Sequence, residues 1–161
     1  MKMRYIFLLA FFVSSSFSVF SEVGWKSQKI ILNSNNPVYT WQFKGIDPQK
    51  EEAIKIPGYP AEGWRNFVAP GDINVELMKQ KVLPDLLFDT LARQANWLTE
   101  KEWWFRLEFD ATVDTAKNVD LVFDFADGTS EVWLNGTKLG DMKDSFYPHR
   151  FNVRKIIKDK G

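Results

Sequence analysis

The chain has 161 residues, with 21 basic and 21 acidic side chains, a single histidine and no cysteine. A balanced charge leaves no electrostatic footprint for nucleic acid or for an anionic membrane surface, so neither is an expected partner. The missing cysteines and lone His149 exclude disulfides, Cys/His nucleophile pairs and Cys- or His-rich zinc sites. We expect one domain, with no metal and no cofactor.

Residues 1–21 are predicted to be a signal peptide. Lys2 and Arg4 open the segment, an apolar run follows over 5–13, and small and polar residues lead to a cleavage site after Ser21. A transmembrane anchor is the alternative, but the run is well short of the ~20 residues that a span needs. The protein is therefore expected to be exported, to the periplasm or outside in a bacterium, or to the secretory pathway or lysosome in a eukaryote. After cleavage no membrane association is expected.

The first half of the mature chain mixes strand and helix patterns. Residues 37–43 are rich in β-branched and aromatic side chains, and 53–56 form a short apolar stretch before a Pro-Gly pair, so both are predicted strands. Residues 72–82 have apolar side chains near helical spacing behind Asp72, a suitable N-cap, which predicts one short helix. The following stretch, 84–97, fits either a second helical turn or an irregular connection.

The second half carries strand patterns at 103–109, 119–125, 131–140 and 150–153. Alternation in the first two predicts inward faces formed by Trp103, Phe105, Leu107 and Phe109, and by Val119, Leu121, Phe123 and Phe125. The third is a predicted hairpin, because Asn135-Gly136 supplies the two positive-φ residues of a type I′ turn. Polar faces, including Arg106 and Glu108, are expected to look outward.

Together these patterns predict an all-β fold: a jelly-roll-like antiparallel β-sandwich with a short helical excursion, incomplete at its C-terminus. The last residues, 151–161, close on a turn signal that usually leads into another strand. Since native domains cover the edge that a missing strand would expose, we expect the chain to be a piece of a longer protein. In such a piece alone, Trp104 is expected to be exposed.

Five segments occur in an order that is typical of one enzyme family: 41–43, 68–85, 96–109, 121–141 and 146–153. Together they resemble the N-terminal sugar-binding-type β-sandwich of family 2 glycoside hydrolases, closest to the β-mannosidases and exo-β-glucosaminidases. Within the set, Asp127, Val132, Leu134 and Asn135-Gly136 match a strand-end Asp and the Leu-Asn-Gly hairpin of the family. The resemblance makes 22–161 a galactose-binding-like β-sandwich domain.

The resemblance also implies an activity. Family members hydrolyse terminal β-linked sugars with retention, which uses two carboxyl groups about 5 Å apart. In the family these are two glutamates on a barrel that comes later in the polypeptide, so no catalytic residue is assigned to this chain, and alone it is expected to be inactive. The implied partners are a β-linked oligosaccharide or glycoside and the downstream barrel. The alternatives are a free-standing secreted carbohydrate-binding module and a secreted interaction domain without a sugar ligand.

Asp144 is the one residue to which the resemblance gives a role. In several family members a carboxylate in the corresponding loop binds a sugar hydroxyl in the barrel's active site, which makes Asp144 a candidate substrate-binding residue. The alternative is a solvated Asp that caps its own turn. The remaining aromatic and imidazole groups have plain interpretations: Trp103 and Phe105 as core, Trp104 as an outer-face or domain contact rather than a sugar platform, and His149 as a loop-packing residue.

Overall fold

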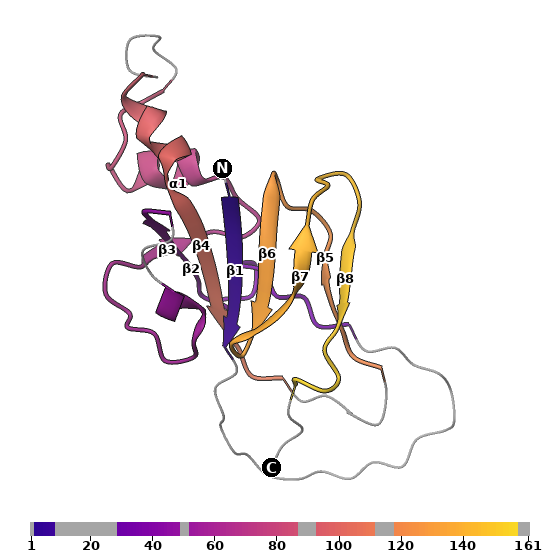
Figure 1. Cartoon of the computed structure of the whole chain (residues 1–161). Coiled ribbons are helices and arrows are strands. Elements are labelled where there is room, and N and C mark those ends of the chain that lie inside the picture. Colours follow the sequence, from indigo (N-terminus) through magenta and orange to yellow (C-terminus); the bar gives the residue numbers. More distant parts are fainter. Residues whose placement is uncertain (1, 9–28, 49–51, 87–92, 112–117, 158–161) are drawn as a thin grey trace.

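The structure, a computed structural model, describes residues 2–8, 29–48, 52–86, 93–111 and 118–157, and for 2–8 the backbone alone (Figure 1). These residues form the strands β1 (Lys2–Leu8), β2 (Trp41–Ile46), β3 (Arg65–Phe67), β4 (Glu102–Glu108), β5 (Asp120–Phe123), β6 (Thr129–Leu134), β7 (Thr137–Met142) and β8 (His149–Asn152). The helical elements are α1 (Ile73–Lys79) and the 3₁₀ segments η1 (Glu52–Lys55) and η2 (Arg93–Glu100).

The strands make a β-sandwich, as predicted. One sheet has the order β3-β2-β4-β1-β6-β7, and β5 pairs with β8 in a second. The pairs β2–β3, β2–β4, β6–β7 and β5–β8 are antiparallel. The exception is β1, which lies between β4 and β6 and is parallel to both (Figure 1).

The hairpin of β6 and β7 has the predicted turn. Asn135 and Gly136 both have positive φ, 49° and 78°, as a type I′ turn requires. Val132 and Leu134 are buried, and a register shift between Val132 and Trp133 marks a bulge that raises the local twist.

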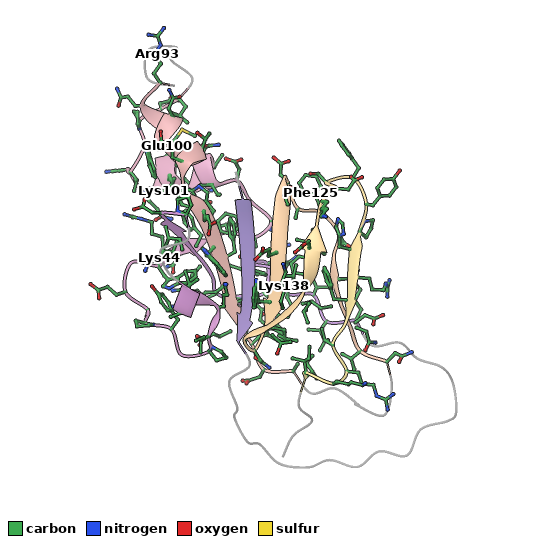
Figure 2. All side chains as sticks on the ribbon, viewed as in Figure 1. Lys44, Arg93, Glu100, Lys101, Phe125 and Lys138 are labelled. Atoms are coloured by element: carbon green, nitrogen blue, oxygen red, sulfur yellow. The ribbon has the colours of Figure 1, made fainter. Side chains whose placement is uncertain are left out.

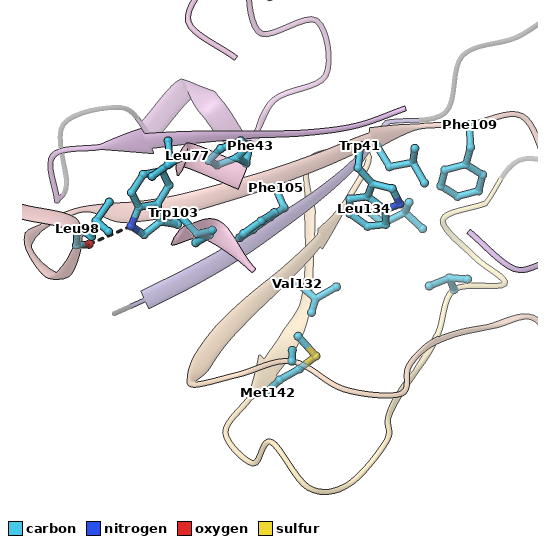
Figure 3. Packing of buried hydrophobic residues seen from close by; sticks show 14 of the residues in the cluster. Trp41, Phe43, Leu77, Leu98, Trp103, Phe105, Phe109, Val132, Leu134 and Met142 are labelled. Atoms are coloured by element: carbon cyan, nitrogen blue, oxygen red, sulfur yellow. Dashed lines mark hydrogen bonds between the residues drawn. The ribbon is translucent and has the colours of Figure 1, made fainter. Parts of the chain in front are cut away.

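The main core lies against β4, whose predicted inward face is confirmed. Trp103, Phe105, Leu107 and Phe109 are all buried there, together with Phe43 of β2 (Figure 3). The indole Nε1 of Trp103 donates a hydrogen bond of 2.9 Å to the carbonyl oxygen of Leu98, so its polar atom is satisfied inside the core.

The other face of β4 is also covered, contrary to the expected polar outer surface. Trp104 is fully buried among Ile46 and Ile54, and Arg106 is only 6% exposed. The cover is the segment after β2, in which 53–56 is not the predicted strand: residues 52–55 form η1, and Ile54 from it packs onto the sheet. The expected exposure of Trp104 is therefore wrong, because its own chain supplies the layer that hides it.

Arg106 is held in this second layer by three contacts. Its Nε donates to Gln42 Oε1 at 2.8 Å, its Nη1 donates to the Tyr59 carbonyl oxygen at 3.2 Å, and its guanidinium lies over the Trp64 ring at 4.3 Å. Burial lowers the pKa of this guanidinium, and the neighbouring carboxylate of Glu108 opposes that effect.

The helical excursion is confirmed. Asp72 caps α1 by accepting a hydrogen bond from the backbone N–H of Val75 at 3.1 Å, and Ile73 and Leu77 are buried. The later segment resolves in part as η2, whereas 87–92 lie outside the described residues.

Two strand boundaries differ from prediction. Residues 37–40 are not part of β2, because Asn36 holds a turn there: its side chain accepts from Val38 N and its carbonyl accepts from Tyr39 N. β5 ends at Phe123, and Phe125, predicted to point inward, is 67% exposed.

The N-terminal residues Lys2–Leu8, predicted to belong to a signal peptide, form β1. The predicted cleavage site after Ser21 lies outside the described residues, so cleavage stays a prediction. None of the helical segments within the described residues has the length and hydrophobicity that a transmembrane helix requires.

Candidate functional site

Two loops meet at one end of the sandwich. Residues 124–128 connect β5 to β6, and 143–148 connect β7 to β8, and both turns lie at the same end in Figure 1. The second loop contains Asp144, the residue for which the family resemblance implies a sugar-binding role.

Asp144 both caps its own turn and faces solvent. Its Oδ1 accepts a hydrogen bond from the backbone N–H of Phe146 at 2.8 Å, the Asx turn of the plain interpretation. Its backbone carbonyl oxygen accepts from Nε2 of His149 at 2.7 Å, which identifies the proton-bearing ring nitrogen and confirms His149 as a loop-packing residue. Within the described part of the chain, the second carboxylate oxygen, Oδ2, accepts no hydrogen bond. The turn therefore fixes the carboxylate without using all of its acceptor capacity.

Ser145 ties the two loops together. Its hydroxyl donates to Oδ1 of Asp127 at 3.4 Å and accepts from the backbone N–H of Gly128 at 3.2 Å. Sequence reasoning placed Asp127 at the strand end before the hairpin but did not identify Ser145. The link joins residues 18 apart in the sequence, so no local pattern predicts it.

Three exposed aromatic side chains lie on the two linked loops. Phe146 and Tyr147 are 89% and 69% exposed, and Phe125 is exposed on the neighbouring loop, where Figure 2 shows its ring projecting from the same end of the sandwich. We refer to Phe125, Phe146 and Tyr147 as the aromatic rim. This rim was not identified from the sequence; the Phe146-Tyr147 pair, which lies outside any strand alternation, is the signal that could have indicated it. Large exposed apolar groups that gather in one place are typical of interaction sites.

The hairpin under the loop carries a charged cluster on its exposed face. Nζ of Lys138 lies 2.7 Å from Oδ1 of Asp141 and 3.3 Å from Oε1 of Glu131. The hydrogen bond to Asp141 raises the pKa of Lys138, and the same bond lowers the pKa of Asp141. All three residues of this network lie in β6 and β7.

A cavity of about 140 Å³ lies elsewhere, beside β2, and is lined by apolar and basic side chains that include Lys44, Arg65, Trp97 and Trp103. Figure 2 shows Lys44 on the opposite side of the molecule from Phe125. The volume is below the ~300–1,000 Å³ of usual small-molecule sites. Among the described residues no group of three or more acidic, histidine or cysteine side chains is placed to hold a metal ion. The loop pair with Asp144 is the candidate site, because it holds a carboxylate fixed by its turn beside exposed aromatic side chains.

Comparisons with known proteins match most of the chain. A family model described as "Glycosyl hydrolase 2 galactose-binding domain-like" matches residues 41–161. Beta-mannosidase B from Aspergillus terreus is 29% identical over 123 residues, which are 75% of this chain and 13% of that protein. Beta-mannosidase B from Thermothelomyces thermophilus is 24% identical over 122 residues, again 75% of this chain and 13% of the relative.

One further relative and one crystal structure also match the chain. An exo-beta-D-glucosaminidase from Streptomyces avermitilis is 23% identical over 66% of this chain and 12% of its own length. The crystal structure of a beta-D-mannosidase from Dictyoglomus thermophilum has a TM-score of 0.57 and 24% identity, and the match covers 74% of this chain and 13% of that structure. At this identity the structural likeness shows the fold. The chain spans about one eighth of the length of these relatives.

Proposed function

Because the chain belongs to the glycosyl hydrolase 2 galactose-binding domain-like family, we propose that it is the N-terminal accessory domain of an exported, β-mannosidase-like exo-glycosidase. The intact enzyme removes terminal β-linked sugars with retention, using a pair of glutamates on a downstream barrel domain. The β-sandwich packs on that barrel and helps to shape its active site, and a β-linked oligosaccharide or glycoside is the substrate.

The geometry of Asp144 is the observation that carries this proposal. Its carboxylate is held by the turn through Oδ1, whereas Oδ2 has no partner among the described residues. Such a group, on a loop tied at Ser145 and supported by a hairpin, can offer a hydrogen-bond acceptor to a sugar hydroxyl with little reorganisation. The aromatic rim supplies apolar area for contact with the barrel around that acceptor.

A free-standing carbohydrate-binding module is the second candidate, and the aromatic rim is the observation that favours it. Aromatic faces next to a carboxylate can stack on sugar rings without any further domain. Calorimetric titration of the 161-residue chain with mannose oligosaccharides separates the two functions. Saturable binding that Tyr147→Ala abolishes supports the module, whereas the accessory domain is expected to bind none of these sugars measurably alone.

The proposed role of Asp144 is tested in the intact enzyme with two substitutions. Asp144→Asn keeps an Asx-turn side chain but removes the charge, and Asp144→Ala removes both. A hydrogen bond to a charged group contributes ~1.5–3 kcal/mol, so Asp144→Ala should lower kcat/KM by roughly one to two powers of ten. Asp144→Asn should show most of the same fall in kcat/KM.

The melting temperature of each variant is the matched control. It reports on the Asx turn of Asp144, whereas kcat/KM reports on binding of the sugar hydroxyl. The Asn variant should melt with the wild type, and the Ala variant at most slightly lower. Wild-type kcat/KM in both variants with several β-glycosides would show that the loop is only a connection. Wild-type activity in Asp144→Asn with a loss in Asp144→Ala would assign the residue to the turn alone.

A further inference from the structure

The cavity beside β2 lies at the edge of the larger sheet, and the proposed function does not use it. Its inner wall is formed by Phe43 of β2, Leu77 of α1 and Trp103 of β4, which Figure 3 shows close together. Phe43 and Leu77 are at most 1% exposed, and Trp103 is 3% exposed. The inner end of the cavity is therefore part of the main core and is apolar.

The cavity is the size of one six-membered ring. Its volume is about 140 Å³, and an apolar protein cavity of about 150 Å³ is large enough to bind benzene. Two of the residues that line it are glycines. A Cβ added at Gly45 would stand 3.0 Å from two ring atoms of Trp103, and one at Gly63 would stand 3.4 Å from Cε of Lys44. Larger side chains at these two positions would therefore reduce the space.

The mouth of the cavity carries a free positive charge. Arg65 of β3 is the register partner of Phe43 in an antiparallel pair, so both side chains leave the same face of the sheet. Phe43 is buried, but Arg65 lies on the edge strand and is exposed, which places its guanidinium where the cavity meets solvent. Within the described part of the chain, this guanidinium has neither a hydrogen-bond acceptor nor a carboxylate partner.

The other polar side chains of the wall also suit an anion. Nζ of Lys44 donates to the hydroxyl of Tyr59 at 3.1 Å, so it adds positive charge from a fixed position. No acidic side chain is among the described residues that line the cavity. Arginine, lysine and tryptophan side chains donate hydrogen bonds and accept none. A carboxylate fits such a wall, whereas sugar hydroxyls, which donate as well as accept, would meet no side-chain acceptor.

We propose that this cavity binds a small monocyclic carboxylate with the size and shape of benzoate. The ring lies against Trp103 and Trp97, whose ring centres are 6.0 Å apart, so both indoles offer aromatic surface to it. The carboxylate forms a pair of parallel hydrogen bonds with the guanidinium of Arg65 at the mouth. The site is independent of the proposed function, because Lys44 and Phe125 of the aromatic rim lie on opposite sides of the molecule (Figure 2).

Benzoate is the probe, titrated into the 161-residue chain and followed by indole fluorescence and by amide NMR shifts. We expect saturable binding with a Kd of about 1 mM or tighter, as the efficiency of ligands of this size allows. The amide signals of Gly45 and Gly63 should shift, and those of residues 143–148 should not. The absence of saturable binding, or shifts confined to other parts of the chain, overturns the proposal.

Two further probes separate the ring from the charge. Benzamide keeps the ring without the charge, and acetate keeps the charge without the ring. Each should bind at least about tenfold more weakly than benzoate, because each loses either the charged hydrogen bonds or the buried apolar area. Benzamide that binds as tightly as benzoate contradicts the pairing with Arg65. Acetate that binds as tightly as benzoate reduces the site to a surface ion pair and overturns the cavity as its location.

Three substitutions locate the ligand. Arg65→Gln should weaken benzoate binding by about ten- to hundredfold. Arg93→Gln is the matched control, since it removes the same charge from an exposed position that does not line the cavity, and it should bind as the wild type does. Val82 lines the cavity and is 38% exposed, so Val82→Phe should fill the space and remove binding.

The melting temperature of each variant is measured beside its affinity. Arg65 and Arg93 are both exposed, so both glutamine variants should melt with the wild type. Equal losses of affinity in these two variants would mean that benzoate responds to the overall charge, and unchanged affinity in Arg65→Gln would mean that Arg65 does not hold it. Either result overturns the proposal, as does full binding by a folded Val82→Phe variant.

Discussion

Gly140 of β7 lies directly against the ring of Phe151 in β8. A Cβ added at Gly140 would stand 2.9 Å from Cε1 of that ring, closer than real contacts allow. This contact joins the two strands that flank the Asp144 loop. We expect Gly140→Ala to lower the free energy of unfolding of the 161-residue chain by about 1–3 kcal/mol, the usual cost of overpacking, as measured by urea denaturation.

The double variant Gly140→Ala/Phe151→Leu is the control, since the smaller side chain leaves room for the methyl group. If the contact is the cause, the double variant should be more stable than the sum of the two single losses predicts. Strict additivity would mean that Gly140 acts through something other than the ring.

Arg106 is expected to matter through its shape as well as its charge. Arg106→Met removes two donors, the Nε–H that Gln42 Oε1 accepts from and the Nη1–H that the Tyr59 carbonyl accepts from, and hydrogen bonds to charged groups are worth ~1.5–3 kcal/mol. We expect a loss of about that size in urea denaturation. Arg106→Lys keeps the charge but loses the planar fork and the stacking on Trp64, so it should be destabilised too. Wild-type stability of Arg106→Lys would show that only the charge is needed there.

Local patterns predicted the parts of this fold that depend on neighbouring residues. The Asn135-Gly136 turn, the Asp72 cap and the inward face of β4 are each encoded within a few positions, and the structure confirms them. The burial of Trp104 is not encoded locally, since it depends on Ile54, fifty residues earlier in the chain and outside any regular periodicity.

In the candidate site, too, some features were predictable from local sequence and others depend on how distant segments meet. The position of Asp144 in a loop after the hairpin followed from the motif order, and its Asx turn followed from the residue type. Ser145 and the exposed Phe125 did not follow, because both depend on how loops 124–128 and 143–148 meet in space. The predicted strand 119–125 also extended two residues past the end of β5 at Phe123, since alternation alone cannot locate where pairing with β8 stops.

The charged cluster on the hairpin predicts a measurable pKa change. The hydrogen bond from Lys138 lowers the pKa of Asp141, so Lys138→Met should raise it toward the ordinary range, which carboxylate NMR titration can follow. Lys143→Met is the control with a smaller effect, because Lys143 acts on Asp141 through charge alone and more weakly. An equal rise in both variants would contradict the assignment to the hydrogen bond.

The same pair gives a signed pH dependence of stability. The depressed pKa of Asp141 adds stability above its unfolded value of about 3.8 and loses it as the pH falls through the folded value. The raised pKa of Lys138 adds stability below about 10.5 and loses it as the pH rises through the folded value. The difference in unfolding free energy between wild type and Lys138→Met should therefore be flat between these limits and shrink outside them. Because both groups are largely exposed, it should also shrink in high salt.

The hydrogen bonds of Ser145 to Asp127 and Gly128 should keep the loop 143–148 ordered. Ser145→Ala removes the donor to Asp127 and the acceptor for Gly128, whereas Asp127→Ala removes only one of these contacts. Both contacts are exposed and long, so each should change the free energy of unfolding by no more than about 1 kcal/mol. Amide hydrogen exchange in 143–148 should nevertheless speed up, most in Ser145→Ala, less in Asp127→Ala, and not in the control Asp124→Ala on the same loop. In the intact enzyme kcat/KM should fall most in Ser145→Ala, less in Asp127→Ala and not in Asp124→Ala. A less ordered loop holds the Asp144 carboxylate less well. Exchange that is equally fast in all three variants would mean that the Asx turn and His149 hold the loop without help from Ser145.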